Sequence, residues 1–218
     1  MIVAVNKPTG WTSFDVVKKV RRITGERKVG HAGTLDPFAE GVLVLGIGRE
    51  STRRLGDITN SKKSYRATLR LGELTDTLDN SGKTVREMPV PQLIESDVAE
   101  TLSRFIGPQS QVPPMFSAKK VGGERLYKLA RKEITVEREP VPIVIESIEL
   151  VSLGIHSIEF SVTCSKGTYV RQLGADFAEA LGTVGHLTRL KRVESGGFTL
   201  DDCISFQEIE ETWMSTVV

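Results

Sequence analysis

An aspartate in a glycine-rich loop is the first candidate for chemistry. Asp36 follows Gly30, His31 and Gly33 and stands directly before Pro37. A carboxylate presented by such a loop can act as a nucleophile, although Asp-Pro is also a common turn dipeptide. The glycines beside the histidine can likewise serve a backbone turn alone. The local pattern therefore leaves a structural turn and a catalytic acid both open.

The sequence favours neither a metal site nor a cofactor site. The histidines at positions 31, 156 and 186 show no i,i+4 pairing, and Cys164 and Cys203 belong to no CxxC motif. A P-loop, a G-x-S-x-G elbow and a full dinucleotide-binding fingerprint are all missing from the sequence. We therefore expect chemistry that uses side chains alone.

Composition indicates a packed chain without a membrane span. Of 218 residues, 39% are hydrophobic and 26% are charged, which suffices for a buried core. The apolar runs are much shorter than the ~20 residues that cross a bilayer, and residues 1–5 do not form a basic leader. We expect a cytoplasmic protein. The net charge is only +1, but basic pairs along the chain and acids at Glu208–Glu211 permit a basic face.

The elements needed to position Asp36 follow from periodicity. Thr12–Asp15 predicts a capping box at the start of a helix that ends at Gly25, and Tyr65–Leu71 alternates as a half-buried strand does. Further strands are expected at 2–5, 42–47, 143–150, 158–164 and 187–193, and further helices at 96–106, 124–132, about 168–181 and from 205. Loops are expected at 30–41, 75–82 and 108–114. Without a regular βαβ alternation, the fold class is α+β.

Seven motifs together resemble the bacterial tRNA pseudouridine-55 synthases of the TruB family. The resemblance extends from about Ile2 to Phe198. The motifs are KPTGWTS, GHAGTLDPFAEGVL, KKSYRATLRLG, TDTLDNSG, SAKKVGGERLYKLAR, CSKGTYVRQLGADFAEALG and HLTRLKR. The resemblance implies a pseudouridine synthase fold: a central mixed, largely antiparallel sheet flanked by helices, with an inserted thumb lobe. It also implies isomerisation of the T-loop uridine at position 55 of tRNA, without metal or cofactor, after the base is flipped out.

The same resemblance implies catalytic roles for three residues. Asp36 matches the catalytic aspartate and Arg171 its ion-pair partner, while Tyr65 matches the tyrosine that stacks on the target base and assists proton removal. On its own, Tyr65 could also be a core tyrosine. Six further residues match substrate-binding positions: His31 holding the T-loop open, Asp79 near the flipped nucleotide, Tyr169 in packing, Leu190 beside the base, and Lys119 and Lys120 as phosphate contacts in the thumb.

Domain organisation and partners follow in the same way. We expect one catalytic domain over 1–218, with the thumb-like insertion at about 108–135. Family members usually continue into a C-terminal RNA-binding domain of the PUA type, and we expect no such domain within these 218 residues. The implied partner is the T-arm stem-loop of tRNA, bound by a monomer.

Two other functions are compatible with parts of the pattern. A non-catalytic tRNA-binding or tRNA-folding chaperone would need the basic faces and the thumb, but not Asp36, Tyr65 and Arg171 together. A hydrolase could pair Asp36 with His31 or His186, although no oxyanion motif accompanies them. Conversion of one uridine without a change in mass would separate the synthase from both alternatives.

Overall fold

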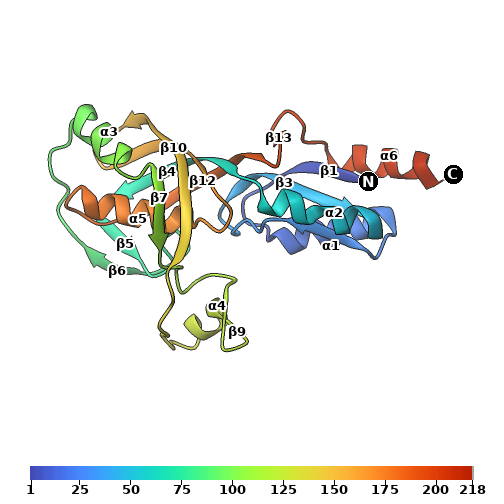
Figure 1. The fold of residues 1–218 in the computed structure, drawn as a ribbon, viewed down its shortest axis with the longest axis horizontal. Helices are drawn as coiled ribbons and strands as arrows, with labels where there is room; N and C mark the ends of the chain where they lie inside the picture. The colour runs from blue at the N-terminus through green and yellow to red at the C-terminus, as the bar shows by residue number, and fades with distance from the viewer. Residues whose placement is uncertain (218) are drawn as a thin grey trace. The chain divides into compact units, whose positions relative to one another are not determined.

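The computed structural model describes residues 1–217, with side chains described through Ser215. The fold is α+β, with a mixed sheet and helices packed against it (Figure 1). The chain forms two compact units, Met1–Arg66 with Leu190–Val218, and Ala67–Arg189. Two strands, β4 (Lys63–Leu71) and β12 (Gly185–Ser195), carry the chain from one unit to the other.

The first unit is organised around β3 (Glu40–Ile47), which has strand partners along both edges. β1 (Ile2–Lys7) pairs antiparallel along one edge. Along the other edge, β2 (Val29–Ala32) pairs antiparallel, and β12 pairs parallel opposite Glu40 and Gly41. This parallel pair makes the sheet mixed, as predicted. The other elements of the unit are α1 (Ser13–Thr24), α2 (Arg49–Asn60), β13 (Phe198–Thr199) and α6 (Phe206–Val217).

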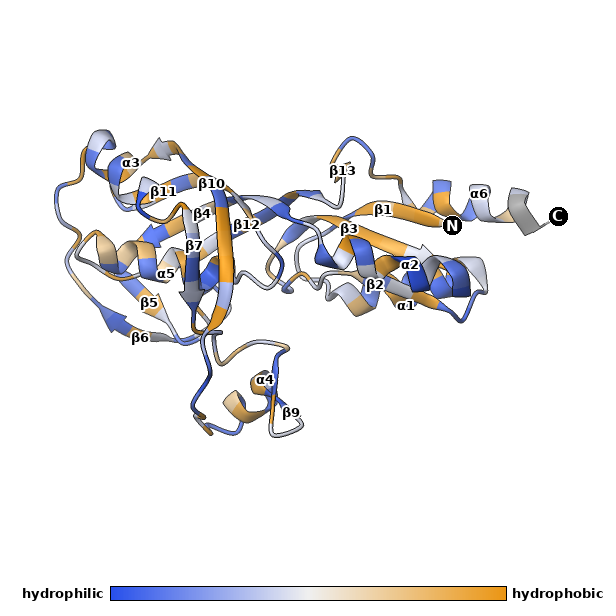
Figure 2. Ribbon diagram, in the orientation of Figure 1, coloured by the Kyte–Doolittle hydropathy of each residue, from blue (hydrophilic) through white to orange (hydrophobic). Residues whose placement is uncertain are grey.

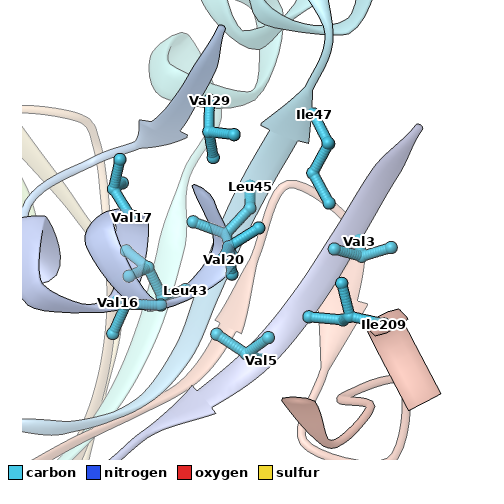
Figure 3. Packing of buried hydrophobic residues seen from close by; sticks show 10 residues of the cluster. All are labelled: Val3, Val5, Val16, Val17, Val20, Val29, Leu43, Leu45, Ile47 and Ile209. Carbon is cyan, nitrogen blue, oxygen red and sulfur yellow. The ribbon is translucent and has the colours of Figure 1, made fainter. Parts of the chain in front are cut away.

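Helix α1 begins and ends at the predicted residues. The Asp15 N–H donates to Thr12 Oγ1 (3.1 Å) and the Thr12 N–H donates to Asp15 Oδ2 (3.0 Å), which completes the capping box. Gly25 ends the helix at a φ of 68°, a left-handed conformation that glycine adopts without steric cost. The apolar face of α1 packs on the sheet (Figure 3). The buried cluster there comprises Val3, Val5, Val16, Val17, Val20, Val29, Leu43, Leu45, Ile47 and Ile209.

Two elements of the first unit differ from the sequence expectations. Helix α2 was not predicted, because charged residues dominate it and Leu55 is its one buried side chain. β2 lies inside the segment expected to be a loop, so His31 is on a strand, opposite Leu45. Ser205, predicted to start the terminal helix, caps α6: its Oγ accepts from the Glu208 N–H at 3.2 Å.

The sheet of the second unit follows the order β4, β11 (Ser157–Cys164), β10 (Val141–Leu153) and β7 (Gly107–Gln111). β10 is antiparallel to both β11 and β7. The prediction that 108–114 is irregular is wrong for its first four residues, which belong to β7. Pro108 is tolerated there because β7 is the edge strand, where a missing N–H leaves no ladder bond unmade.

Helix α5 (Val170–Ala180) covers this sheet and carries Arg171 in its first turn. Its core residue Phe177 packs edge-on against Phe160 (ring centroids 6.3 Å apart) and Phe105 (6.0 Å). The helix begins at Val170, later than predicted. α3 (Glu95–Ser103) is shorter than predicted and has no side-chain cap at its N-terminus. A hairpin of β5 (Glu73–Thr75) and β6 (Thr84–Glu87) was not predicted and flanks the predicted acidic turn.

The segment 112–140, here named the lobe, leaves the sheet after β7 and returns to it at β10 (Figure 1). It contains the short hairpin β8 (Lys120–Val121) and β9 (Glu124–Arg125), followed by α4 (Leu126–Ala130). The predicted helix over 124–132 is therefore shortened at both ends. The side chain of Leu126 is fully buried and gives the lobe a small apolar anchor.

The hydropathy of the residues agrees with the packing of helices against the sheet. Figure 2 shows hydrophobic residues concentrated along β1 and β3 and hydrophilic residues along most of α2. Within residues 1–217, none of the helices has the length and apolar character needed to cross a membrane.

Candidate active site

The loop that carries Asp36 connects β2 to β3 in the first unit, and its main chain is fixed on both sides of the aspartate. The Leu35 N–H donates to Ser13 Oγ (2.9 Å), and the same hydroxyl lies 3.2 Å from Leu35 O. On the other side, the Gly10 N–H donates to Pro37 O at 2.7 Å. The Asp36 side chain itself is partly exposed. The loop therefore presents a carboxylate from a backbone that has little freedom to move.

Two buried cations underlie this loop. Arg192 of β12 is 1% exposed and donates through Nε to Val42 O (2.7 Å) and through Nη2 to Gly33 O (3.0 Å). The Nζ of Lys7, also buried, donates to Pro8 O (2.9 Å) and Trp11 O (2.6 Å).

Burial lowers the pKa of Lys7 to about 8, with the nearby charge of Asp36 opposing the shift and that of Arg192 adding to it. The Asp36 loop is thus built over two basic side chains.

Close packing of β12 against β3 requires glycine at position 41. A Cβ there would lie 2.2 Å from Arg192 O, and the φ of Gly41 is 107°. Any side chain at this position would push Arg192 away from the loop. The glycine of the GHAGTLDPFAEGVL motif therefore serves the buried cation as well as the turn.

Three other predicted site residues belong to the first unit. The pKa of His31 is lowered, mainly by burial and secondly by the charge of Arg192. Its imidazole is therefore neutral at pH 7. Its Nδ1 is buried and has no hydrogen-bond partner among the described residues. Tyr65 lies on the buried side of β4, and Leu190 lies on the same face of β12 as Arg192.

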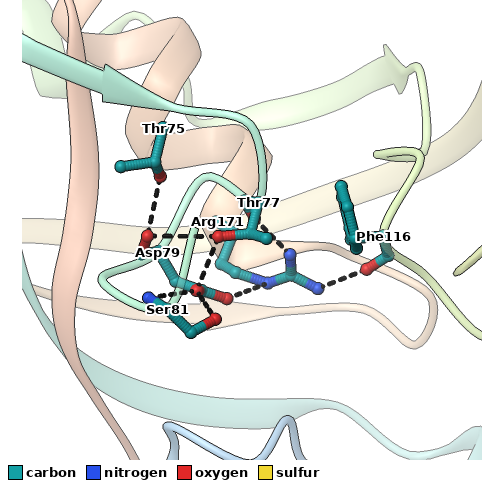
Figure 4. Close-up of polar contacts among 6 residues, drawn as sticks. All are labelled: Thr75, Thr77, Asp79, Ser81, Phe116 and Arg171. Atoms are coloured by element: carbon teal, nitrogen blue, oxygen red, sulfur yellow. Dashed lines mark hydrogen bonds and ion pairs between the residues drawn. The ribbon is translucent and has the colours of Figure 1, made fainter. Parts of the chain in front are cut away.

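In the second unit, Asp79 and Arg171 form a buried cluster (Figure 4). Asp79 Oδ1 accepts hydrogen bonds from Thr77 Oγ1 (2.8 Å), the Ser81 N–H (2.9 Å) and the Ser81 hydroxyl. Its Oδ2 lies 3.6 Å from Arg171 Nε, and the two side chains are 6% and 3% exposed. Arg171 also donates through Nη1 to Thr77 O and through Nη2 to Phe116 O (2.8 Å).

The start of α5 is fixed by a side chain from β7. Gln111 Nε2 donates to Tyr169 O (3.1 Å), and the Tyr169 N–H donates to Gln111 Oε1 (2.8 Å). Tyr169 is the N-cap residue of α5, and no side-chain cap bond is formed there. The sequence predicted a helix that already includes Tyr169, whereas the structure confirms only Arg171 as helical, and it gave no signal for Gln111.

The two lysines predicted to contact phosphates lie in the lobe. Lys120 is exposed, and Lys119 is half-buried, with its Nζ donating to Glu139 O at 3.3 Å. The main chain around them is ordered by the Leu126 N–H donating to Lys119 O (2.8 Å) and the Tyr127 N–H to Ser117 O (3.0 Å). Lys120 is thus presented to solvent, whereas Lys119 already has one contact inside the lobe.

The predicted site residues are divided between the two units, and a direct contact is described for Asp79 with Arg171. Asp36, His31, Tyr65 and Leu190 belong to the first unit; Asp79, Arg171, Tyr169 and both lobe lysines belong to the second. The ion pair of Asp36 with Arg171 stays a prediction. The described residues contain no group of three or more His, Cys, Asp or Glu side chains that could hold a metal ion. Sequence reasoning assigned no site role to Arg192 or Gln111, because their effect depends on contacts distant in the chain.

Solved structures define the fold. A chain in the "Crystal Structure of a Cbf5-Nop10-Gar1 Complex" is similar over 100% of this chain and 56% of its own length, with a TM-score of 0.75 and 25% identity. A chain in the "Structure of H/ACA RNP bound to a substrate RNA containing 2'-deoxyuridine" is similar in fold, with a TM-score of 0.71 and 23% identity over 100% of this chain and 55% of that one. This chain spans little more than half of each. The fold is that of the pseudouridine synthases.

Sequence comparisons give the family. Residues 21–170 match "TruB family pseudouridylate synthase (N terminal domain)". Relatives agree: "tRNA pseudouridine synthase B" of Clostridium tetani is 44% identical over 210 residues, covering 96% of this chain and 72% of that protein. The protein of the same name from Bacillus velezensis is 45% identical over 216 residues, covering 96% and 70%. The chain belongs to the TruB family of pseudouridylate synthases.

Proposed function

We propose that this chain converts the uridine at position 55 of the tRNA T-loop into pseudouridine, with Asp36 as the catalytic carboxylate. Membership of the TruB family, over a matched region that includes the Asp36 loop, is the observation that carries this proposal. The relatives described above carry the name tRNA pseudouridine synthase B, which supports tRNA as the substrate. We take the T-arm stem-loop as the portion bound, by a monomer.

The reaction is an isomerisation in which atoms balance without a co-reactant. The N1–C1′ bond of uridine breaks, the uracil turns, and a C5–C1′ bond forms. The proton on C5 leaves to solvent, and N1 gains a proton. A carboxylate can attack C1′ or the base, or assist elimination, and each route needs it ionised. Arg192 supports the main chain of the loop that presents this carboxylate.

The remaining residues receive roles that suit their chemistry. Arg171 presents a planar fork that can orient the Asp36 carboxylate. Tyr65 stacks on the extruded uracil and its hydroxyl takes part in removing the C5 proton. Extruding a base costs a few kcal/mol, which contacts in the pocket offset. These contacts come from His31, Asp79, Tyr169 and Leu190, with Lys119 and Lys120 on phosphates.

A T-arm stem-loop with tritium at C5 of the target uridine tests the proposal. A synthase releases tritium to water while the mass of the unlabelled RNA stays constant. A hydrolase gives free base or cleaved RNA, and a folding chaperone binds RNA without either change. Absence of tritium release by a folded preparation that binds the stem-loop would exclude the synthase activity.

A further inference from the structure

We infer that Gln111 is a positioning residue for Arg171, and that it sets the rate of the chemical step without touching RNA. The inference rests on the proposed function, because that function gives Arg171 its catalytic role. Gln111 is the last residue of β7, directly before the lobe, and it is 3% exposed. A buried amide at this place needs an explanation that packing alone does not supply.

The Gln111 amide holds the peptide groups at the start of α5 from both sides. It donates to Tyr169 O at 3.1 Å and accepts from the Tyr169 N–H at 2.8 Å. The side chain thereby reproduces the paired N–H···O bonds that two residues exchange in an antiparallel ladder. Arg171 follows two residues later in the first turn of the helix, so a shift of Tyr169 displaces the root of the Arg171 side chain.

The first turn of α5 also contacts the chain at Phe116, five residues after Gln111. Arg171 Nη2 donates to Phe116 O at 2.8 Å. The segment 111–116 is therefore clasped at both ends by Tyr169 and Arg171. Between these ends lie Pro113 and Pro114, whose rings fix φ and limit how far the segment can yield. The start of the lobe is thus joined to the first turn of α5 at two points, and Gln111 forms the first of them.

An amide side chain of this length satisfies both the N–H and the carbonyl of Tyr169. Glutamine offers a donor and an acceptor at fixed separation, whereas glutamate when ionised only accepts and methionine does neither. Glutamate would place a carboxylate oxygen against Tyr169 O, and methionine would remove both hydrogen bonds to Tyr169. Both variants keep the approximate length of the side chain, so they test the hydrogen bonds rather than the volume.

Gln111→Met tests the inference, and Gln109→Met is its matched control. Gln109 lies on the same strand, and its amide donates to Phe105 O rather than to the start of α5. We expect Gln111→Met to lower the single-turnover rate of tritium release about 10- to 100-fold, because a small misplacement of a catalytic group has effects of this size. The Kd for the T-arm stem-loop should stay within about threefold of the parent, and Gln109→Met should keep the rate within about twofold.

A second background separates positioning from general loss of structure. In an Arg171→Lys protein the guanidinium fork is gone, so Gln111→Met should add less than about threefold to the rate defect already present. Equal fold losses in both backgrounds would contradict action through Arg171. A fall in melting temperature with an unchanged rate would also overturn the inference, since Gln111 would then serve stability alone.

Amide exchange gives a readout that needs no RNA. The Tyr169 N–H should exchange faster in Gln111→Met and remain protected in Gln111→Glu, which keeps the acceptor. If Gln111→Met fails to fold, Gln111→Glu carries the rate measurement, and a parental rate in that variant would refute the inference. If the parent protein releases no tritium, the proposed function fails, whereas unchanged exchange at Tyr169 would refute the clasp itself.

Discussion

Asp36 and Asp79 are the same residue type in opposite situations. The main chain on both sides of Asp36 is fixed by Ser13 and Gly10, and its carboxylate is partly exposed. The Asp79 carboxylate is buried, with one oxygen accepting three hydrogen bonds and the other facing Arg171. The first region fixes the backbone and presents the acid; the second surrounds the acid with donors.

This difference predicts which acid reacts and which one orders its surroundings. The Asp79 carboxylate is buried and already accepts three hydrogen bonds through Oδ1, so it also orders the loop around it. Removing the Asp79 carboxylate takes an acceptor away from Thr77 and Ser81 and a negative charge away from the buried Arg171. We expect this loss to lower the free energy of unfolding. Because the proposed function makes Asp36 the catalytic carboxylate, Asp36 should dominate turnover, whereas the buried Asp79 should dominate folding stability. Substitutions at each acid separate these two effects.

The largest expected effect belongs to Asp36→Asn. The amide keeps the shape and can still hydrogen-bond, but it loses the negative charge and the nucleophilicity. We expect turnover to fall by about 10⁴-fold or more, with T-arm binding within about tenfold. The free energy of unfolding should change by less than ~1 kcal/mol. Single-turnover tritium release, filter binding and urea melts measure these three quantities. Substantial residual turnover in a clean preparation would remove Asp36 from the catalytic role.

Asp79→Ala should lower folding stability more than Asp36→Asn does. Breaking a buried ion pair from one side takes the Asp79 carboxylate away from the Arg171 charge, and we expect a loss of about 3–5 kcal/mol in the free energy of unfolding. Asp97→Ala on the exposed start of α3 provides a control at a solvated aspartate. A stability loss no greater than that of the control would mean that the Asp79 cluster does not order this unit.

Tyr65→Phe should affect rate far more than affinity. The phenyl ring still stacks on the extruded base, whereas the hydroxyl proposed for proton transfer is gone. We expect the single-turnover rate to fall about 10²-fold with the Kd within about threefold. Equal losses in rate and in binding would instead identify Tyr65 as a residue that only places the substrate.

The smallest expected effect is on salt dependence. Lys119→Ala combined with Lys120→Ala should weaken T-arm binding and flatten the slope of log K against log salt by roughly 0.7–0.9 for each lysine–phosphate pair that the substitutions abolish. The single variants resolve the two lysines: Lys120 is exposed, whereas Lys119 donates to Glu139 O. We therefore expect Lys120→Ala to account for more of the change. Identical slopes for the double variant and the parent would reject both lysines as phosphate ligands.

Sequence patterns predicted those parts of the fold that depend on neighbouring residues. The Thr12–Asp15 capping box and the alternation of β4 are local, and the structure confirms both. α2 was missed because one buried leucine among charges gives no helical period. β7 was missed because Gly107 and Pro108 are typical of loops, and only the position at a sheet edge permits them in a strand. The roles of Arg192 and Gln111 depend on partners 159 and 58 positions away.

The distance in sequence between Gly33 and Arg192 has a consequence for synthesis of the chain. The two residues are 159 positions apart, yet the Arg192 guanidinium donates to Gly33 O beneath the Asp36 loop. At ~5–20 residues per second, the ribosome delivers the arginine roughly 8–30 s after the loop. Until then the loop rests on Lys7 alone, so the nascent protein completes the support of its presented aspartate only after residue 192 has been added.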